Sequence, residues 1–228
     1  MYANNEEFLK SHNIKYLMTV TCKLHTNINI NKVLKYMNSD IIQITENSRF
    51  KNSVYATLIL PNSTNIKFKI FINGVLQFMD CHYDNFITAV NILIQLLRTG
   101  ANGTNKHIEF IDNHNTIGIY DIKTLQVNSH FDMGYTVNID ELLKLLDTHH
   151  SSTTLDTDIG YVKRINITYG HRCSIEYQKI TIHVFDETIA IWGKSIEDII
   201  IAYEYINKIL YRYENNIKIV SMDTNDKD

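Results

Sequence analysis

The chain has 228 residues, of which 44% are hydrophobic, so it can bury a core and is not globally disordered. Its single proline excludes a proline-rich linker, and its three widely spaced cysteines exclude a disulfide framework and a cysteine zinc motif. No apolar run approaches the roughly 18 residues of a membrane helix, and residues 1–10 are polar and acidic, unlike a secretory signal. We therefore expect an intracellular protein.

The net charge of −3 is unevenly distributed. Residues 13–98 hold nine basic and four acidic side chains, whereas residues 116–214 hold nine basic and 14 acidic ones. Such asymmetry is typical of a protein in which one half faces phosphate and the other faces a protein partner.

The first half begins with residues 16–24, which alternate in polarity and predict a strand, and residues 31–37 predict a short helix. Residues 53–60, 66–72 and 75–79 predict a three-stranded meander. Its turns are Pro61-Asn-Ser-Thr-Asn65 and Asn73-Gly74, and we expect the second to be a type I′ turn. Residues 80–98 show helical spacing, and Gly100 is a plausible end.

The second half repeats this order. A strand is expected within residues 118–131 and a short helix at 138–148. Strands at 161–169 and 174–185 flank an expected turn at 170–173, and a strand at 189–192 precedes a long helix at 195–214. We predict an N-terminal extension (1–12), a first repeat (13–99), a linker (100–115), a second repeat (116–214) and a flexible tail (215–228).

Internal repetition at this scale indicates one supersecondary unit used twice. In each unit an antiparallel sheet has one face covered by a helix and leaves its other face open. We expect the two open faces to form a binding surface.

Three stretches carry a resemblance to a known family. Residues 120–128 (YDIKTLQVN) are similar to its second-repeat opening LDFKIQNMV, residues 48–50 (SRF) resemble KRF, and residues 70–74 (IFING) resemble IFSSG. Over residues 13–98 and 116–214 the chain resembles the TATA-box-binding protein family. This register places Gln126 and Asn128, and in the first repeat Leu17 and Thr19, on the family's base-contacting asparagine and valine. Leu17 has no group that hydrogen-bonds a base edge.

The resemblance implies an α+β saddle, in which two pseudo-symmetric repeats form one curved antiparallel sheet with helices on the convex side. It also implies that the protein binds and bends promoter DNA through the minor groove, with apolar side chains inserted between base steps as wedges. Phe71 and Phe185 match the family's later wedges. Counting across a hairpin centred near Leu60 predicts Phe50 opposite Phe71, and a turn centred near Arg172 predicts Ile159 opposite Phe185.

Period-2 alternation places Lys67 and Lys69 on the face of Phe71, and Thr181 and His183 on the face of Phe185. The complete predicted DNA-contacting set is Leu17, Thr19, Arg49, Phe50, Lys67, Lys69, Phe71, Gln77, Met79, Gln126, Asn128, Ile159, Thr181, His183, Phe185 and Trp192.

The partners implied are double-stranded, AT-rich DNA, a transcription factor IIB-like protein and the RNA polymerase machinery, with no membrane, cofactor or metal. The composition resembles that of TBP-like proteins of large DNA viruses, which implies the nucleus, a cytoplasmic virus factory or the virion. Enzymatic motifs fail: Trp192-Gly-Lys-Ser195 resembles the end of a phosphate-binding loop, but the required earlier glycine is Thr188.

Two alternatives stay open. One is a TBP-like interaction module that has lost DNA binding, which the acidic second half and Leu17 favour. The other is a small-molecule-binding fold, which requires a cavity between the sheet and a long helix.

Overall fold

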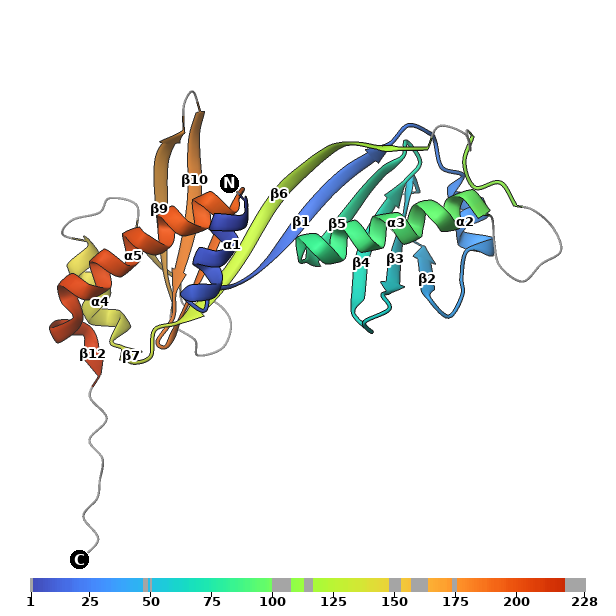
Figure 1. Ribbon diagram of the computed structural model, residues 1–228. Coiled ribbons are helices and arrows are strands. Elements are labelled where there is room, and N and C mark those ends of the chain that lie inside the picture. The colour runs from blue at the N-terminus through green and yellow to red at the C-terminus, as the bar shows by residue number, and fades with distance from the viewer. Residues whose placement is uncertain are drawn as a thin grey trace, which may run out of the picture. The chain divides into compact units, whose positions relative to one another are not determined.

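The computed structural model describes residues 2–46, 49, 51–99, 108–112, 117–147, 153–156, 164–173 and 176–219. They form two compact units, which we name after the repeats (Figure 1). The first-repeat unit is Leu17–Gln126, and the second-repeat unit combines Met1–Tyr16 with Val127–Asp228. The unit boundaries lie within strands rather than at the predicted linker.

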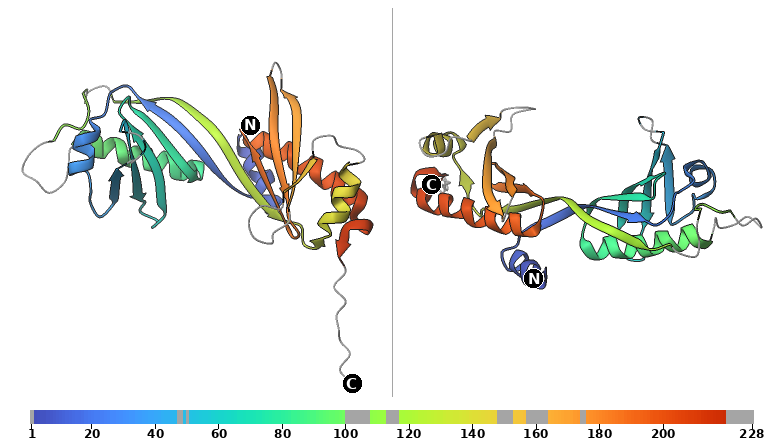
Figure 2. Two further views of the ribbon diagram at one scale, coloured as in Figure 1. Left: turned by 180° about the vertical axis from the view of Figure 1, so that it is seen from behind. Right: turned by 90° about the horizontal axis from the view of Figure 1, so that it is seen from above.

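The first-repeat unit is an antiparallel sheet with a long helix along one side (Figure 2). Its strands follow the order β2-β3-β4-β5-β1, and the first part of β6 continues this order. The elements are β1 (Lys15–Leu24), α2 (Ile30–Tyr36), β2 (Ile42–Glu46), β3 (Ser53–Ile59), β4 (Asn65–Phe71), β5 (Val75–Cys81), α3 (Tyr83–Thr99) and β6 (Ile119–Asp132).

The second-repeat unit has the same construction, with strand order β6-β11-β10-β9-β8. Its elements are α4 (Ile139–Asp147), β8 (Thr153–Asp156), β9 (Arg164–Cys173), β10 (Glu176–Val184), β11 (Thr188–Gly193) and α5 (Ile196–Ile217). The strands β7 (Thr136–Val137) and β12 (Lys218–Ile219) pair separately, and α1 (Tyr2–Ser11) packs on α5 (Figure 1).

The α+β class and the repeated order of strand, short helix, meander and long helix agree with the sequence prediction. Five elements of the described chain were not predicted: the edge strands β2 and β8, which occupy matching places in the two units, the paired strands β7 and β12, and helix α1. The two edge strands are short, and α1 is polar except for a few residues such as Leu9, which is fully buried.

The predicted register of both hairpins was wrong. Residues 170–173 do not turn, because they continue β9 and pair with β10, with Val184 opposite Ile165. Extending this register by one residue would place Phe185 opposite Arg164 rather than Ile159. In the first repeat the β3–β4 turn lies further along the chain than predicted, so Phe71 pairs with Ser53 rather than Phe50. Phe50 and Ile159 themselves lie outside the described residues.

The turn between β4 and β5 also differs from the prediction. A type I′ turn needs positive φ at both central residues, but only Gly74 of the Asn-Gly pair has it, at 79°. The loop is the three residues Ile72 to Gly74, closed by the amide of Gly74 donating to the carbonyl of Phe71 at 3.0 Å. Ile72, the last residue of the strand predicted at 66–72, lies in this loop and is 51% exposed.

Replacing Gly74 by alanine is expected to destabilise the protein by more than about 1 kcal/mol, because φ is positive and the new Cβ meets backbone. It would overlap the carbonyl oxygen of Thr26 and lie 2.9 Å from that of Leu24. Gly134 is the matched control, with φ of 78° and no atom within 4 Å of an added Cβ. Urea denaturation measures the unfolding free energy of both variants, and the difference between their losses is the cost of the clash at Gly74. Equal losses in the two variants would contradict a clash.

The core of each unit lies between its sheet and its long helix. In the first-repeat unit, Phe68 stacks on Phe78 with ring centroids 4.9 Å apart, and Phe86 of α3 meets Phe78 edge-on at 5.2 Å. In the second-repeat unit, Ile180, Ile182 and Val184 of β10 are fully buried on the side where α5 packs. None of the helices in the described ranges combines the length and apolarity needed to cross a lipid bilayer.

Candidate nucleic-acid interface

Strand β4 separates the two faces of the first-repeat sheet. Ile66, Phe68 and Ile70 are buried toward α3, whereas Lys67, Lys69 and Phe71 point to the opposite face. Lys67 is exposed, and Lys69 and Phe71 are partly exposed. The side that lacks α3, which we call the first open face, therefore carries the predicted lysines and the predicted wedge.

Cross-strand pairing extends this face into two transverse rows. The first row contains Thr57, Lys67 and Met79. The second row contains Tyr55, Lys69, Gln77 and Thr21. The Lys69 Nζ lies 5.1 Å from the centre of the Tyr55 ring, a cation–π contact that holds the ammonium group above the sheet. Tyr55 was missed because its place beside Lys69 depends on the register of β3.

Leu17 and Thr19 lie on β1, between residues of the buried face. Met18 and Val20 are buried, whereas Leu17 is 38% exposed and Thr19 is partly exposed. The pairing with β5 is irregular between Met18 and Val20, where the single residue Thr19 faces both Met79 and Asp80 of β5. Arg49 is exposed and lies outside the strands.

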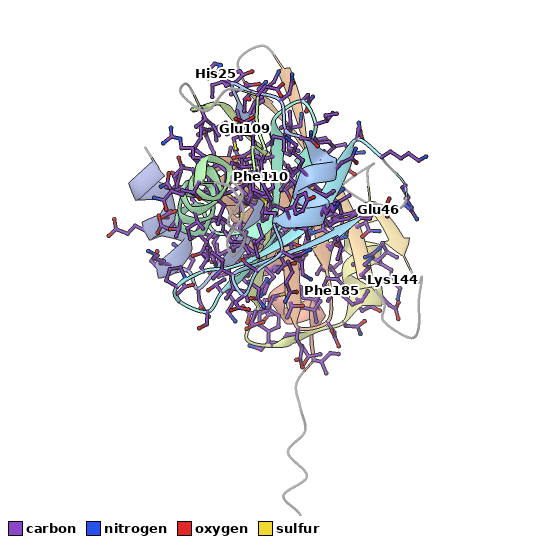
Figure 3. All side chains as sticks on the ribbon, turned by 90° about the vertical axis from the view of Figure 1, so that its right-hand side faces the viewer. His25, Glu46, Glu109, Phe110, Lys144 and Phe185 are labelled. Atoms are coloured by element: carbon purple, nitrogen blue, oxygen red, sulfur yellow. The ribbon has the colours of Figure 1, made fainter. Side chains whose placement is uncertain are left out.

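The corresponding face of the second-repeat unit, which we call the second open face, carries the other predicted residues. One transverse row contains Asn128, Trp192, Thr181 and Thr168. Trp192 is 43% exposed, and Asn128 and Thr181 are partly exposed. Gln126, predicted in the second repeat, is partly exposed but is the last residue of the first-repeat unit. Phe185, labelled in Figure 3, follows β10 directly, and its amide donates to the carbonyl of Thr188 at 2.9 Å. Its side chain is partly exposed.

His183 shares this face by alternation but is only 5% exposed. Its Nδ1 lies 2.5 Å from Oδ1 of Asn166, which is directly opposite on β9. The ring of Trp192 meets it at 4.3 Å between centroids, with 65° between the ring planes. These two neighbours explain why His183 is covered, which the sequence alone does not reveal.

Two cations of the second open face were missed. Lys179 is exposed and alternates with Thr181 on β10. Arg164 opens β9 opposite Asp156, one residue before the Ile165–Val184 pair. Counting back from Phe185 in steps of two would have found Lys179, whereas Arg164 required the true hairpin register.

The two open faces match position by position. Lys67 opposite Met79 corresponds to Thr181 opposite Trp192. Likewise, Lys69 opposite Tyr55 corresponds to His183 opposite Asn166. In both units a phenylalanine, Phe71 or Phe185, follows two residues after the second of these positions.

The described residues show no arrangement typical of catalysis. Burial raises the pKa of the Cys22 thiol to about 12 and that of Cys81 to about 11, so neither forms a reactive thiolate near neutral pH. Within the described ranges, no three His, Cys, Asp or Glu side chains gather to hold a metal ion. Residues 192–195, which resemble part of a phosphate-binding loop, instead lead into a capping box in which Ser195 and Asp198 cap α5.

Comparison with known proteins supports the same family. No protein-family model matches the chain. A protein of Acanthamoeba polyphaga mimivirus described as TATA-box-binding protein-like is 34% identical over 264 aligned positions, which span 98% of this chain and 72% of the relative.

The chain belongs to the TATA-box-binding protein-like family. The resemblance predicted from residues 48–50, 70–74 and 120–128 is thereby confirmed. The α+β class is confirmed with it. This TBP-like protein has a homologue in a large DNA virus, and its family is generally non-enzymatic.

Proposed function

We propose that this TBP-like protein binds duplex DNA through the minor groove with its two open faces and bends it by inserting Phe71 and Phe185 between base steps. One observation supports the proposal: in each unit a phenylalanine, Phe71 or Phe185, lies two residues beyond matched positions of the open face, Lys69 and His183. Chains that bend DNA from the minor groove use apolar wedges of this kind.

The remaining side chains of the two faces suit the same surface. The minor groove offers a degenerate pattern of acceptors, so it is contacted chiefly by apolar and small hydrogen-bonding groups. Leu17, Met79 and Trp192 supply apolar surface, and Gln77 and Asn128 supply amide groups. Because Leu17 has no hydrogen-bonding group, we expect shape and deformability of AT-rich DNA to matter more than base-edge contacts here.

Lys67 and Lys69 provide the phosphate-binding charge of the first open face. They alternate with the buried residues of β4, and Lys69 is held by the Tyr55 ring. Each lysine that neutralises a phosphate releases condensed counterions, which makes binding dependent on salt.

Replacing Lys67 and Lys69 by alanine is expected to reduce the slope of log K against log salt by about 1 for each lysine, because about 0.9 counterion is released per phosphate. Fluorescence anisotropy of a labelled AT-rich duplex at several salt concentrations measures this slope. Lys208→Ala removes an exposed lysine from α5 and should leave the slope unchanged. Equal slopes for all three proteins would contradict phosphate binding by β4.

The acidic balance of residues 116–214 favours a second role for the second repeat. We propose that it also contacts a transcription factor IIB-like protein and, through it, the RNA polymerase machinery, in the nucleus, a virus factory or the virion. A chain that bound such a partner but no duplex would be an interaction module rather than a DNA-bending factor. The duplex titration separates these two functions.

A further inference from the structure

The side chains of the two open faces differ in kind at two matched positions. Where the first-repeat unit has Met79 and Lys69, the second-repeat unit has Trp192 and His183. A flexible thioether and a cation are thus replaced by an indole and a covered imidazole. The second face consequently has less charge and a larger rigid aromatic surface at this point.

The Trp192 ring contacts a side chain of the neighbouring strand. Ala190, two residues earlier on β11, is paired directly opposite His183, so Trp192 and His183 are diagonal neighbours on the same face. The Trp192 ring meets the His183 ring at 4.3 Å, and His183 is in turn hydrogen-bonded to Asn166. Since the Asn166 oxygen is an acceptor, the histidine Nδ1 carries the hydrogen and donates. The ring orientation of His183 is therefore fixed by β9.

Despite this support, 43% of Trp192 remains exposed. An indole packed on one side and exposed on the other is a rigid apolar surface that is already oriented for a partner. Its row-mates Asn128 and Thr181 carry only neutral hydrogen-bonding groups. This chemistry suits the walls and floor of the minor groove better than it suits phosphates.

We propose that His183 and Asn166 are positioning residues, which orient the Trp192 ring so that it packs against deoxyribose and base edges. The inference rests on the proposed function and adds a division of labour to it. The first open face binds DNA largely through salt-dependent contacts of Lys67 and Lys69. The second open face adds the salt-independent apolar contact of Trp192 to the charge of Lys179 and Arg164.

Salt dependence separates these contributions. Trp192→Ala should weaken binding to an AT-rich duplex about 10-fold, a loss typical of one apolar contact. Because a neutral indole displaces no counterions, the slope of log K against log salt should stay at the wild-type value. Trp192→Phe should lose less. An unchanged affinity of Trp192→Ala in a protein that still binds DNA overturns the proposal.

Trp192 is the chain's single tryptophan, so the tryptophan fluorescence of the protein comes from this residue alone. In the full-length protein, saturation with the duplex should protect its fluorescence from acrylamide quenching. Without DNA, Asn166→Leu and His183→Ala should lower its fluorescence anisotropy, because the ring loses its support, while the thermal unfolding midpoint confirms that both variants are folded. Asn128→Ala, in the same row but outside this support, should keep the wild-type anisotropy.

The outcomes are distinguishable. Wild-type protein that binds DNA without protecting Trp192 rejects the contact, and unchanged anisotropy in both support variants rejects the positioning role. Wild-type protein that binds no duplex overturns the proposed function itself.

Discussion

Replacing Phe71 and Phe185 together by alanine is expected to abolish DNA bending and to weaken binding about 10- to 100-fold. Burying the apolar surface of one phenylalanine contributes about 1.5–3 kcal/mol, and this contribution is lost at each position. The loss of affinity is smaller than the sum of both terms, because the unbent duplex no longer requires unstacked base steps. Energy transfer between dyes at the two duplex ends measures bending, and anisotropy measures affinity.

Tyr211→Ala is the control for this double variant. Tyr211 is 85% exposed but belongs to α5, so its removal takes away an aromatic side chain without touching either open face. It should bind and bend DNA like the wild type. If the double variant bends DNA as the wild type does, the two phenylalanines are not wedges.

Phe78→Ala is expected to cost about 3–5 kcal/mol of unfolding free energy, the usual range for a fully buried phenylalanine. Phe78 is fully buried and contacts both the Phe68 ring, which it stacks on, and the Phe86 ring of α3. Its removal leaves a cavity between the sheet and the helix. Because domains of this kind have only about 5–15 kcal/mol of stability in total, a substantial unfolded population is expected.

The matched control is Phe71→Ala, which deletes the same side chain from the opposite face. Phe71 is partly exposed beyond β4, so we expect a cost below about 1 kcal/mol, as for substitutions away from the core. Denaturant titration of both variants compares the two faces directly. Similar losses would mean that Phe71 is a core residue, and its assignment as a wedge would fail.

Alternation assigned the two faces correctly within β4 and β10. In β4, Phe68 and Ile70 had to face a helix, because their neighbours Lys67 and Lys69 cannot be buried without partners. The same reasoning held for Ile180, Ile182 and Val184, all of which are buried. Alternation wrongly placed Ile72 with Phe68 and Ile70, because Ile72 lies in the loop after β4 and is 51% exposed. Helix α3 was recognisable from its apolar spacing, although it begins at Tyr83 and not at Asp80.

The strand register of the hairpins and the contacts between distant elements could not be predicted from the sequence. Nothing in the glycine and cysteine of residues 170–173 shows that the ladder continues through them, and for this reason the predicted pairing of Phe185 with Ile159 used the wrong register. The burial of His183 depends on Trp192 and Asn166, which lie on two different neighbouring strands. Helix α1 docks on α5 through residues such as Phe8, which meets Tyr203 edge-on at 5.9 Å, a contact between distant parts of the chain.

The matched positions of the two units point to unequal roles. The first open face carries the β4 lysines Lys67 and Lys69, the second of which lies over the Tyr55 ring. The second open face carries Trp192, whose ring contacts His183. The pairing of β4 with β5 matches the pairing of β10 with β11, but the exposed side chains at the matched positions differ. Phe71 and Phe185 are the feature that they share.

The most direct test is a titration of the wild-type protein with end-labelled AT-rich and GC-rich duplexes at about 50 mM and about 200 mM salt, with binding and end-to-end distance followed together. We predict binding that weakens steeply with salt, a preference for the AT-rich duplex, and a shortened end-to-end distance in the complex. Absence of binding to either duplex at low salt would contradict the proposed function and would favour a protein-interaction module.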